Sequence, residues 1–218
     1  MTVVTGATYA NLLSEVGYNV VMIDKREHIA GNAYTERVDG IDIHRYGAHI
    51  FHTPNQFVWD YVNKFGDWHP YEHRVLAVSH GQVFTLPFTL KTLSEVYGYH
   101  MTPEQGSELI EKATRQFKST NNLEEKALSL IGQPVYDAMI REYTMKQWGV
   151  HPRELDPNII TRLPVRMNYD TRYFNDKFQG IPTEGYTSII DEMIYDCEVF
   201  LNTDWFDIRD EVNGPRLS

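Results

Sequence analysis

The first 24 residues place the strongest constraint on the fold, because they alternate strand, helix and strand patterns. Val3-Val4 starts a short apolar strand, Thr5-Gly6 marks a turn, and residues 7–16 carry apolar side chains at helical spacing. Residues 19–23 (NVVMI) are rich in β-branched side chains and predict a second strand, which ends on Asp24. A strand, a helix and a strand closed by an acidic residue form one βαβ unit, so we expect an α/β fold of the Rossmann type.

This βαβ unit carries only part of a dinucleotide fingerprint. The fingerprint uses three glycines between strand and helix, for the tight turn, the approach to the pyrophosphate and the helix packing. Only Gly6 stands there, whereas Asp24 follows it by 18 residues, where a carboxylate accepts a hydrogen bond from a ribose hydroxyl. The pattern by itself leaves a nucleotide site and a purely structural βαβ unit equally open.

The rest of the chain indicates a helical segment inserted between regions of short strands. Residues 31–53 contain turn signals, among them a hairpin-like turn at Asp39-Gly40, and residues 74–86 have the pattern of a hairpin. Residues 90–155 carry helical periodicity with N-caps and glycine stops: Thr102 with Pro103 predicts the start of one helix, and residues 135–148 predict another. Residues 159–165 are expected to be extended or loop-like. A helix over 185–196 and a strand over 197–201 follow. The layout is that of an α/β domain interrupted by helices.

Composition and charge exclude several classes of protein. With 42% hydrophobic and 23% charged residues among 218, the chain is globular, not disordered, collagen-like or of low complexity. No stretch is apolar over the length of a membrane span, and no signal peptide is visible, so we expect no membrane association. The single cysteine, Cys197, is typical of a reducing compartment and predicts a cytoplasmic protein. The net charge of −10 argues against binding of nucleic acid.

Three closely spaced histidines, His44, His49 and His52, raise the question of a metal site. Their spacing is neither that of the helical H-E-x-x-H motif nor that of a Cys/His finger, and no carboxylate completes a helical set. We therefore expect no metal, and interpret them as structural histidines or as contacts to a flavin or a sugar.

Residues 143–173 (YTMKQWGVHPRELDPNIITRLPVRMNYDTRY) combine aromatic side chains with two arginines, Arg162 and Arg166, around a loop that contains proline. Arginine donates forked hydrogen bonds to phosphate, and aromatic faces stack on bases and sugars, so the set suits a nucleotide-sugar diphosphate. The alternative, which the residues alone favour, is that Tyr143 and Trp148 pack in the core and the arginines are solvated.

Four longer segments carry a family resemblance: DKREHIAGNAYTE (24–36), HRYGAHIFHT (44–53), YTMKQWG (143–149) and YFNDKFQGIPTEGYT (173–187). In this order, and over essentially the whole chain, the sequence resembles UDP-galactopyranose mutase. The resemblance implies an isomerase that interconverts UDP-galactopyranose and UDP-galactofuranose for cell-wall polysaccharide synthesis. The cofactor would be reduced FAD, whose N5 forms a covalent adduct with the sugar.

The resemblance also implies the domains and the cofactor residues. Segments 1–70 and 185–218 would form the FAD-binding α/β domain, 71–89 and 160–184 part of an antiparallel sheet that meets the substrate, and 90–159 a helical domain with a mobile loop. The expected cofactor contacts are Thr5, Gly6, Asp24, Lys25, Asn32, His49, Ile50, Asp204 and Trp205.

No side-chain nucleophile is implied, and Arg162 and His49 would support catalysis by the flavin. For the nucleotide sugar, the resemblance implies contacts from His73, Tyr143, Thr144, Trp148, Arg162 and Tyr173. Homodimers are usual among bacterial members, and the resemblance carries this over as an expectation.

Two departures from the family pattern qualify these expectations. The glycine-rich loop is shorter by several residues between Val4 and Gly6, and the family's C-terminal portion does not follow Ser218. We therefore keep a second hypothesis, a non-catalytic fragment that folds and at most binds UDP or a nucleotide sugar. A third, an amine-oxidase-like flavoprotein, is disfavoured by the YTMKQWG motif and the Arg162 loop.

Overall fold

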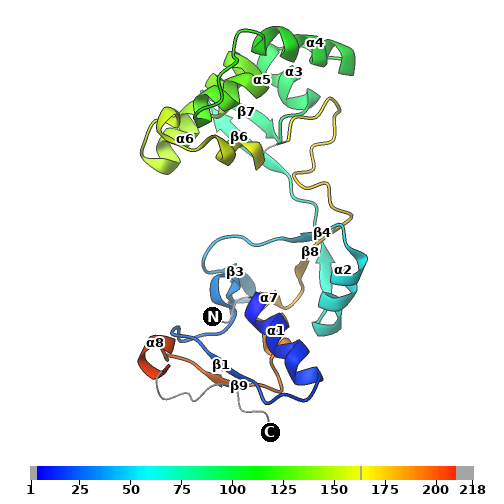
Figure 1. Cartoon of the computed structure of the whole chain (residues 1–218). Coiled ribbons are helices and arrows are strands. Elements are labelled where there is room, and N and C mark those ends of the chain that lie inside the picture. Colours follow the sequence, from blue (N-terminus) through cyan, green and yellow to red (C-terminus); the bar gives the residue numbers. More distant parts are fainter. Residues whose placement is uncertain (1–3, 163, 210–218) are drawn as a thin grey trace. The chain divides into compact units, whose positions relative to one another are not determined.

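The computed structural model describes residues 4–162 and 164–209 and divides the chain into two compact units. Unit 1 consists of residues 1–71 and 176–218, and unit 2 of residues 72–175 (Figure 1). Unit 2 is continuous in sequence, whereas unit 1 is assembled from two segments that flank it.

Unit 1 is a mixed α/β structure. Its helices and short 3-10 helices are α1 (Val4–Glu15), η1 (Gly31–Ala33), α2 (Gln56–Val62), η2 (Asn63–Phe65), α7 (Gly185–Met193) and α8 (Trp205–Ile208). Its strands are β1 (Val21–Ile23), β2 (Thr35–Val38), β3 (Ile41–His44), β4 (Phe51–Thr53), β5 (Trp68–Pro70), β8 (Phe178–Pro182) and β9 (Glu198–Phe200).

The strands among the described residues of unit 1 form three small sheets. β1 pairs in parallel with β9, so that Met22 lies opposite Val199, and the helices α1 and α7 pack against each other beside this pair. β2 and β3 form an antiparallel hairpin, and β4-β8-β5 form an antiparallel sheet. The core beside α1 and α7 consists of Ala7, Ala10, Met22, Ala30, Ile189, Ile190, Met193 and Ile194.

Unit 2 is mainly helical, with one hairpin of β6 (Val75–Ser79) and β7 (Gln82–Leu86). Its helices are α3 (Leu90–Tyr97), α4 (Pro103–Thr114), α5 (Leu123–Met139), α6 (Arg141–Trp148), η3 (Pro152–Glu154) and η4 (Pro157–Arg162). α5 is kinked at Gly132, whose φ is +72°, and Pro134 lies at the start of its second half, where a missing N–H costs nothing. The core centres on α5 and on the buried side chains of Phe88, Leu90, Leu93, Ile131 and Tyr136.

The expected mixture of sheet and helix, with helices inserted between regions of short strands, is confirmed. One local prediction at the N-terminus is wrong. Thr5 and Gly6 do not form a turn after a strand but lie in the first turn of α1, and Val4 begins that helix. Residues 1–3 lie outside the described residues.

Two further differences concern unit 2. Residues 159–165 were expected to be extended or loop-like, but residues up to Arg162 form the 3-10 helix η4, whose entry is fixed by the Asp156 carboxylate accepting the Asn158 N–H at 2.7 Å. The expected helix over 135–148 is interrupted at Ile140, which separates α5 from α6.

Candidate functional site

Asp24 lies at the carboxyl end of β1 and is held there by its backbone. Its N–H donates to the Phe200 carbonyl at 2.9 Å, and its own carbonyl accepts from the Thr203 N–H at 3.0 Å. The side chain is only 7% exposed, and its Oδ1 accepts a hydrogen bond from the Arg26 N–H at 3.0 Å. The end of a parallel strand pair is the place where open α/β sheets bind ligands, and a buried carboxylate stands there.

A cavity of about 370 Å³ opens beside Asp24. It is lined by Ile23, Asp24, Lys25, Arg26, Gly31, Asn32, Thr203, Asp204, Trp205 and Phe206. Five residues predicted to contact a cofactor therefore share this cavity: Asp24, Lys25, Asn32, Asp204 and Trp205. The N-terminal and C-terminal segments of unit 1 meet here.

Arg26 and Phe206 also line the cavity, and the sequence analysis missed both. The Arg26 guanidinium donates to Asn32 Oδ1 at 2.7 Å and lies 4.8 Å from the centre of the Tyr46 ring. Phe206 is 72% exposed and lies beside Trp205. Asp204 caps α8, where both aromatic residues stand, by accepting the Phe206 N–H at 3.0 Å. Two sequence signals could have identified them: Arg26 directly follows Asp24-Lys25, and Phe206 is the second aromatic residue after Asp204.

The other predicted cofactor residues lie elsewhere in unit 1. Thr5 and Gly6 are in the first turn of α1, and His49 and Ile50 are in the loop between β3 and β4. None of these four residues lines the cavity beside Asp24.

His49 belongs to a cluster with His44 and Tyr186. The His49 backbone N–H donates to His44 Nδ1 at 3.0 Å, and the Tyr186 ring meets both imidazoles edge-on at 5.6 and 6.2 Å between centroids. Within the described residues, the buried Nε2 of His49 has no hydrogen-bond partner. Burial, and then the neighbouring His49, lower the pKa of His44, while Asp42 acts in the opposite direction. His52 is not in this cluster, since it contacts Asp176 at 2.5 Å.

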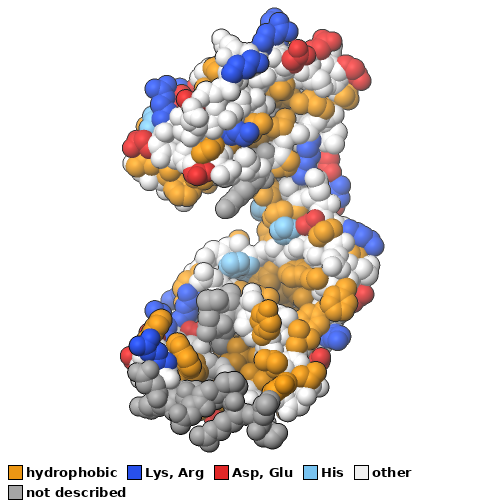
Figure 2. Space-filling model, in the orientation of Figure 1, with side chains coloured by type: hydrophobic (Ala, Val, Ile, Leu, Met, Phe, Trp, Pro, Cys, Tyr) orange, Lys and Arg blue, Asp and Glu red, His pale blue; other side chains and the backbone are white. Residues whose placement is uncertain are grey.

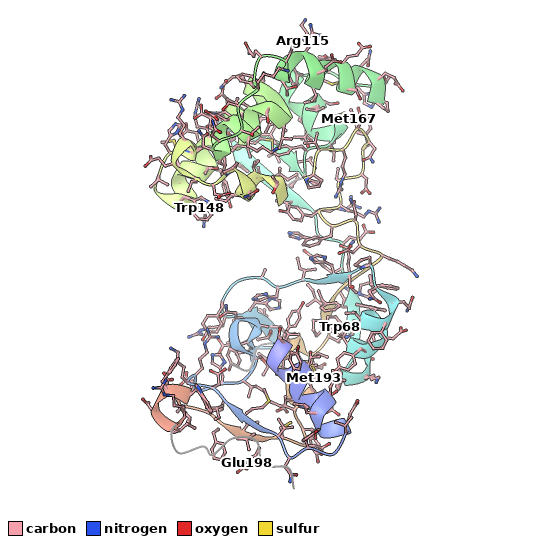
Figure 3. All side chains as sticks on the ribbon, in the orientation of Figure 1. Trp68, Arg115, Trp148, Met167, Met193 and Glu198 are labelled. Atoms are coloured by element: carbon pink, nitrogen blue, oxygen red, sulfur yellow. The ribbon has the colours of Figure 1, made fainter. Side chains whose placement is uncertain are left out.

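The predicted substrate residues all lie in unit 2, and three of them are on α6. Tyr143 is 64% exposed and Trp148 is 53% exposed, and Trp148 projects outward at the end of the helix (Figure 3). The interpretation of these aromatics as core residues is therefore wrong, and Figure 2 shows other hydrophobic side chains at the surface as well. Thr144 differs, because it is buried at 5% exposure and presents little surface to a ligand.

His73 and Tyr173 lie together on the two chain segments at the edge of unit 2. The Tyr173 N–H donates to the His73 carbonyl at 2.8 Å, and the two rings meet edge-on at 5.4 Å. Arg166 organises the same segment, because its guanidinium donates to the carbonyls of Arg172 at 2.6 Å and Tyr173 at 3.2 Å. The suggestion that Arg166 is a solvated cation is therefore wrong, since backbone carbonyls accept from both of its terminal amino groups.

Arg162 ends η4, and its side chain lies outside what the structure describes. Among residues 4–162 and 164–209, no group of three or more His, Cys, Asp or Glu side chains is placed to hold a metal ion. No helix in the same ranges has the length and apolar character needed to cross a membrane.

Comparison with known proteins identifies two family models in the chain. Residues 138–216 match the model for UDP-galactopyranose mutase, and residues 4–65 match that of an NAD(P)-binding Rossmann-like domain. A solved structure, described as a crystal structure of reduced UDP-galactopyranose mutase, superposes on 92% of this chain and 47% of its own with a TM-score of 0.69 at 18% identity. At that identity the likeness establishes the fold.

Sequence relatives are closer. A probable UDP-galactopyranose mutase of Klebsiella pneumoniae is 46% identical over 197 residues, which are 89% of this chain and 51% of the relative. A dTDP-fucopyranose mutase of Escherichia coli is 42% identical over 87% of this chain and 51% of its own length. A UDP-galactopyranose mutase of Mycoplasma genitalium is 31% identical over 88% of this chain and 49% of its own. The chain thus spans about half the length of these curated relatives.

Proposed function

We propose that this chain takes part in interconverting UDP-galactopyranose and UDP-galactofuranose. The proposal starts from its homology to the UDP-galactopyranose mutase family, which extends over about half the length of its relatives. Unit 1 would bind FAD, and unit 2 would bind the nucleotide sugar. The observation that carries the cofactor part is the buried Asp24 carboxylate beside a cavity of about 370 Å³ at the carboxyl end of β1.

The residues around that cavity fit the ADP portion of FAD. A ribose hydroxyl would donate to the Asp24 carboxylate, whose ionised oxygens only accept. Lys25 and Arg26 supply positive charge for the pyrophosphate, and the exposed ring of Trp205 offers a face for a base. The first turn of α1, with Thr5 and Gly6, offers further N–H donors to an anion.

His49 fits a flavin contact on a separate ground. Its Nε2 is buried without a partner among the described residues, and leaving a buried polar atom unpaired costs about 1–3 kcal/mol. A hydrogen bond to a bound cofactor would remove that cost. When bound, reduced flavin supplies the nucleophile for the anomeric carbon, so that no side chain of this chain need form a bond to the sugar.

The residues of unit 2 would bind and orient the nucleotide sugar. Tyr143 and Trp148 present exposed aromatic faces to the uracil and the sugar. Arg162 would neutralise the diphosphate, and Tyr173 would donate a hydrogen bond to it. Orientation of this kind lowers the entropy lost on reaching the transition state. The homodimer and the cytoplasmic location remain predictions.

The cofactor part is tested by visible absorbance of the purified chain after incubation with FAD and removal of the excess. We expect flavin bands at a ratio near one per chain. Asp24→Asn should weaken retention about tenfold or more, because the ribose loses a charged acceptor. Asp39→Asn is the matched control, since it makes the same change on the exposed turn between β2 and β3, where Asn tolerates the positive φ of 51°. A colourless wild-type protein would contradict the proposal.

The substrate part is tested by calorimetric titration of UDP, independently of FAD. Trp148→Ala and Arg162→Ala should each weaken binding, Arg162→Ala by about 1.5–3 kcal/mol for each lost charge-assisted bond. Arg115→Ala, at a guanidinium whose side chain is 75% exposed, is the control. Binding of UDP without retention of FAD or turnover under dithionite would support the alternative of a non-catalytic fragment.

A second candidate substrate is a dTDP-sugar, because the dTDP-fucopyranose mutase of Escherichia coli is 42% identical to this chain. Running the turnover assay with UDP-galactopyranose and with dTDP-fucopyranose in parallel decides between them. A higher kcat/KM for the dTDP-sugar would transfer the proposal to that substrate class while leaving the cofactor part unchanged.

A further inference from the structure

The loop of residues 45–50 folds back onto the last residue of β3. Two of its N–H groups donate to His44: Gly47 to the carbonyl at 3.4 Å and His49 to the imidazole Nδ1 at 3.0 Å. Gly47 adopts a φ of +107°, which lets the chain reverse within this short loop. His44 is thus the point to which the His49 end of the loop is attached, while at the other end the Arg45 N–H donates to the Tyr34 carbonyl at 3.2 Å and the Tyr46 hydroxyl lies 2.7 Å from His28 Nε2.

His44 is itself fixed by regular structure. It pairs with Thr35 in the β2–β3 hairpin, and Thr35 is bonded to the start of α7. The Thr35 N–H donates to Thr187 Oγ1 at 2.8 Å, and Thr187 Oγ1 donates to the Thr35 carbonyl at 2.7 Å. Tyr186, at 6% exposure, packs its ring edge against both imidazoles. The orientation of His44 is therefore set by β2 and α7 rather than by the loop.

The bond to His49 requires a particular form of His44. An imidazole nitrogen accepts only when it carries no proton, so His44 must be neutral with its hydrogen on Nε2. We infer that neutral His44 is a positioning residue for His49: through Nδ1 it holds the 45–50 loop and so fixes the ring that the proposed function assigns to the cofactor. The role of His49 toward the cofactor rests on the proposed function, whereas the His44–His49 bond does not depend on it.

Protonation of His44 would place two donors opposite each other and break the bond to His49, while Arg45 and Tyr46 keep their own contacts. Burial and the proximity of His49 lower the pKa of His44, so that the accepting form persists below the ordinary value of 6.5. The Asp42 carboxylate on the same strand acts in the opposite direction and raises the pKa of His44. The next residue along the chain, Arg45, forms an ion pair with Glu36 at 2.7 Å. Tyr186 faces the ring from α7 and, as a buried phenol, carries no charge. The bond should hold at neutral pH and be lost as the pH falls through the lowered pKa of His44.

Two substitutions separate positioning from packing. His44→Asn places Oδ1 where Nδ1 stands and cannot be protonated, whereas His44→Phe keeps a ring and removes the acceptor. His80→Asn is the control, because His80 lies exposed in the β6–β7 turn of unit 2, where Asn tolerates its φ of 50°.

The first readout is exchange of the His49 amide hydrogen by NMR in the protein without flavin, together with the ¹⁵N shifts of the His44 ring. In the wild type we expect the Nε2–H tautomer and a high protection factor, the intrinsic base-catalysed exchange rate divided by the measured rate at the same pH, which drops as the pH falls through the pKa of His44. Exchange should be about tenfold faster in His44→Phe, and near the wild-type rate but without the extra acid dependence in His44→Asn. An Nδ1–H tautomer, or unchanged exchange in His44→Phe, would overturn the inference.

The second readout is retention of FAD. His44→Phe should weaken it several-fold and His44→Asn should restore most of the loss, with His80→Asn equal to wild type. Equal retention in all four proteins would overturn the role of His44 toward the cofactor. If no protein retains FAD while the exchange results stand, the proposed function fails and the His44–His49 bond remains established.

Discussion

Unit 1 contains every residue predicted to bind the cofactor, and unit 2 contains every residue predicted to bind the nucleotide sugar. The two units also differ in how they are packed. Among the described residues, three alanines, Ala7, Ala10 and Ala30, stand in the core of unit 1 beside larger side chains such as Ile190, whereas the core of unit 2 is built mainly from large side chains such as Leu93. Since stabilisation grows with the apolar area buried, we expect the core of unit 2 to contribute more to stability than the core of unit 1.

The largest expected effect tests the core of unit 2. Leu93 is 1% exposed, and Leu93→Ala should lower the free energy of unfolding by about 2–5 kcal/mol through lost burial and a cavity. Leu76→Ala, at a leucine that is 66% exposed on β6, should change it by less than about 0.5 kcal/mol. Hydrogen exchange measured by mass spectrometry resolves the two units. Equal loss of protection in both would show that they do not unfold separately.

The next effect concerns the kink of α5. An added Cβ at Gly132 would lie 2.7 Å from the Ala113 Cβ, in a backbone conformation with φ +72°. Gly132→Ala should therefore cost about 2–4 kcal/mol from strain and overpacking together. Gly98→Ala shares the positive φ of +80° but has open space around it, so about 1 kcal/mol is expected. The difference between the two variants in the free energy of unfolding, measured with urea, gives the cost of the close contact with Ala113. Equal destabilisation of both variants would show that this contact costs nothing.

A smaller effect is expected at Arg166, which links the fold of unit 2 to its predicted substrate site. Arg166→Met removes the hydrogen bonds to the carbonyls of Arg172 and Tyr173 and should cost about 1–3 kcal/mol. It should also weaken UDP binding, because Tyr173 loses its fixed place. Arg115→Met is the control, and titration of UDP is the measurement. If Arg166→Met bound UDP as tightly as Arg115→Met, Arg166 would have no role in the predicted substrate site.

The smallest effect is a pH dependence in the same segment. Hydrogen bonds from Arg172 hold the pKa of Asp170 at about 2, below its usual value of 3.8. Because the folded state favours the ionised carboxylate, this stabilisation is complete above about pH 4 and is lost as the pH falls toward 2. NMR titration of the Asp170 carboxyl should give the low pKa, and Arg172→Gln should return it toward 3.8. A wild-type value near 3.8 would contradict the ion pair.

Where local chemistry decides the structure, the sequence predicted it. Thr102 with Pro103 was expected to start a helix, and α4 begins there with a capping box to Gln105. Asp39-Gly40 was expected to form a hairpin turn, and both residues have the positive φ that such a turn requires, 51° and 81°. These outcomes depend on side chains within a few residues of each other.

Where partners distant in sequence decide, the prediction was wrong or incomplete. Gly6 looked like a turn, but α1 extends through it because Ala7 and Ala10 pack in a core with α7. Arg166 looked like a free cation; its acceptors, the carbonyls of Arg172 and Tyr173, are near in sequence, but they reach the guanidinium only because the loop folds back on itself. The cavity beside Asp24 was half predicted, since Asp204 and Trp205 were expected there and Arg26 and Phe206 were not.

The backbone bonds that hold Asp24 have a consequence for the order of events during synthesis. They join residue 24 to residues 200 and 203, so the wall of the cavity is complete only after residue 203 has left the ribosome. Unit 2 is continuous from 72 to 175 and has its full set of partners earlier. Contacts between segments so distant in sequence also form slowly. The nascent chain would therefore be able to form its predicted sugar-binding unit before the cavity beside Asp24 exists, and a ligand seated there would mark a chain in which residues 24 and 203 have already met.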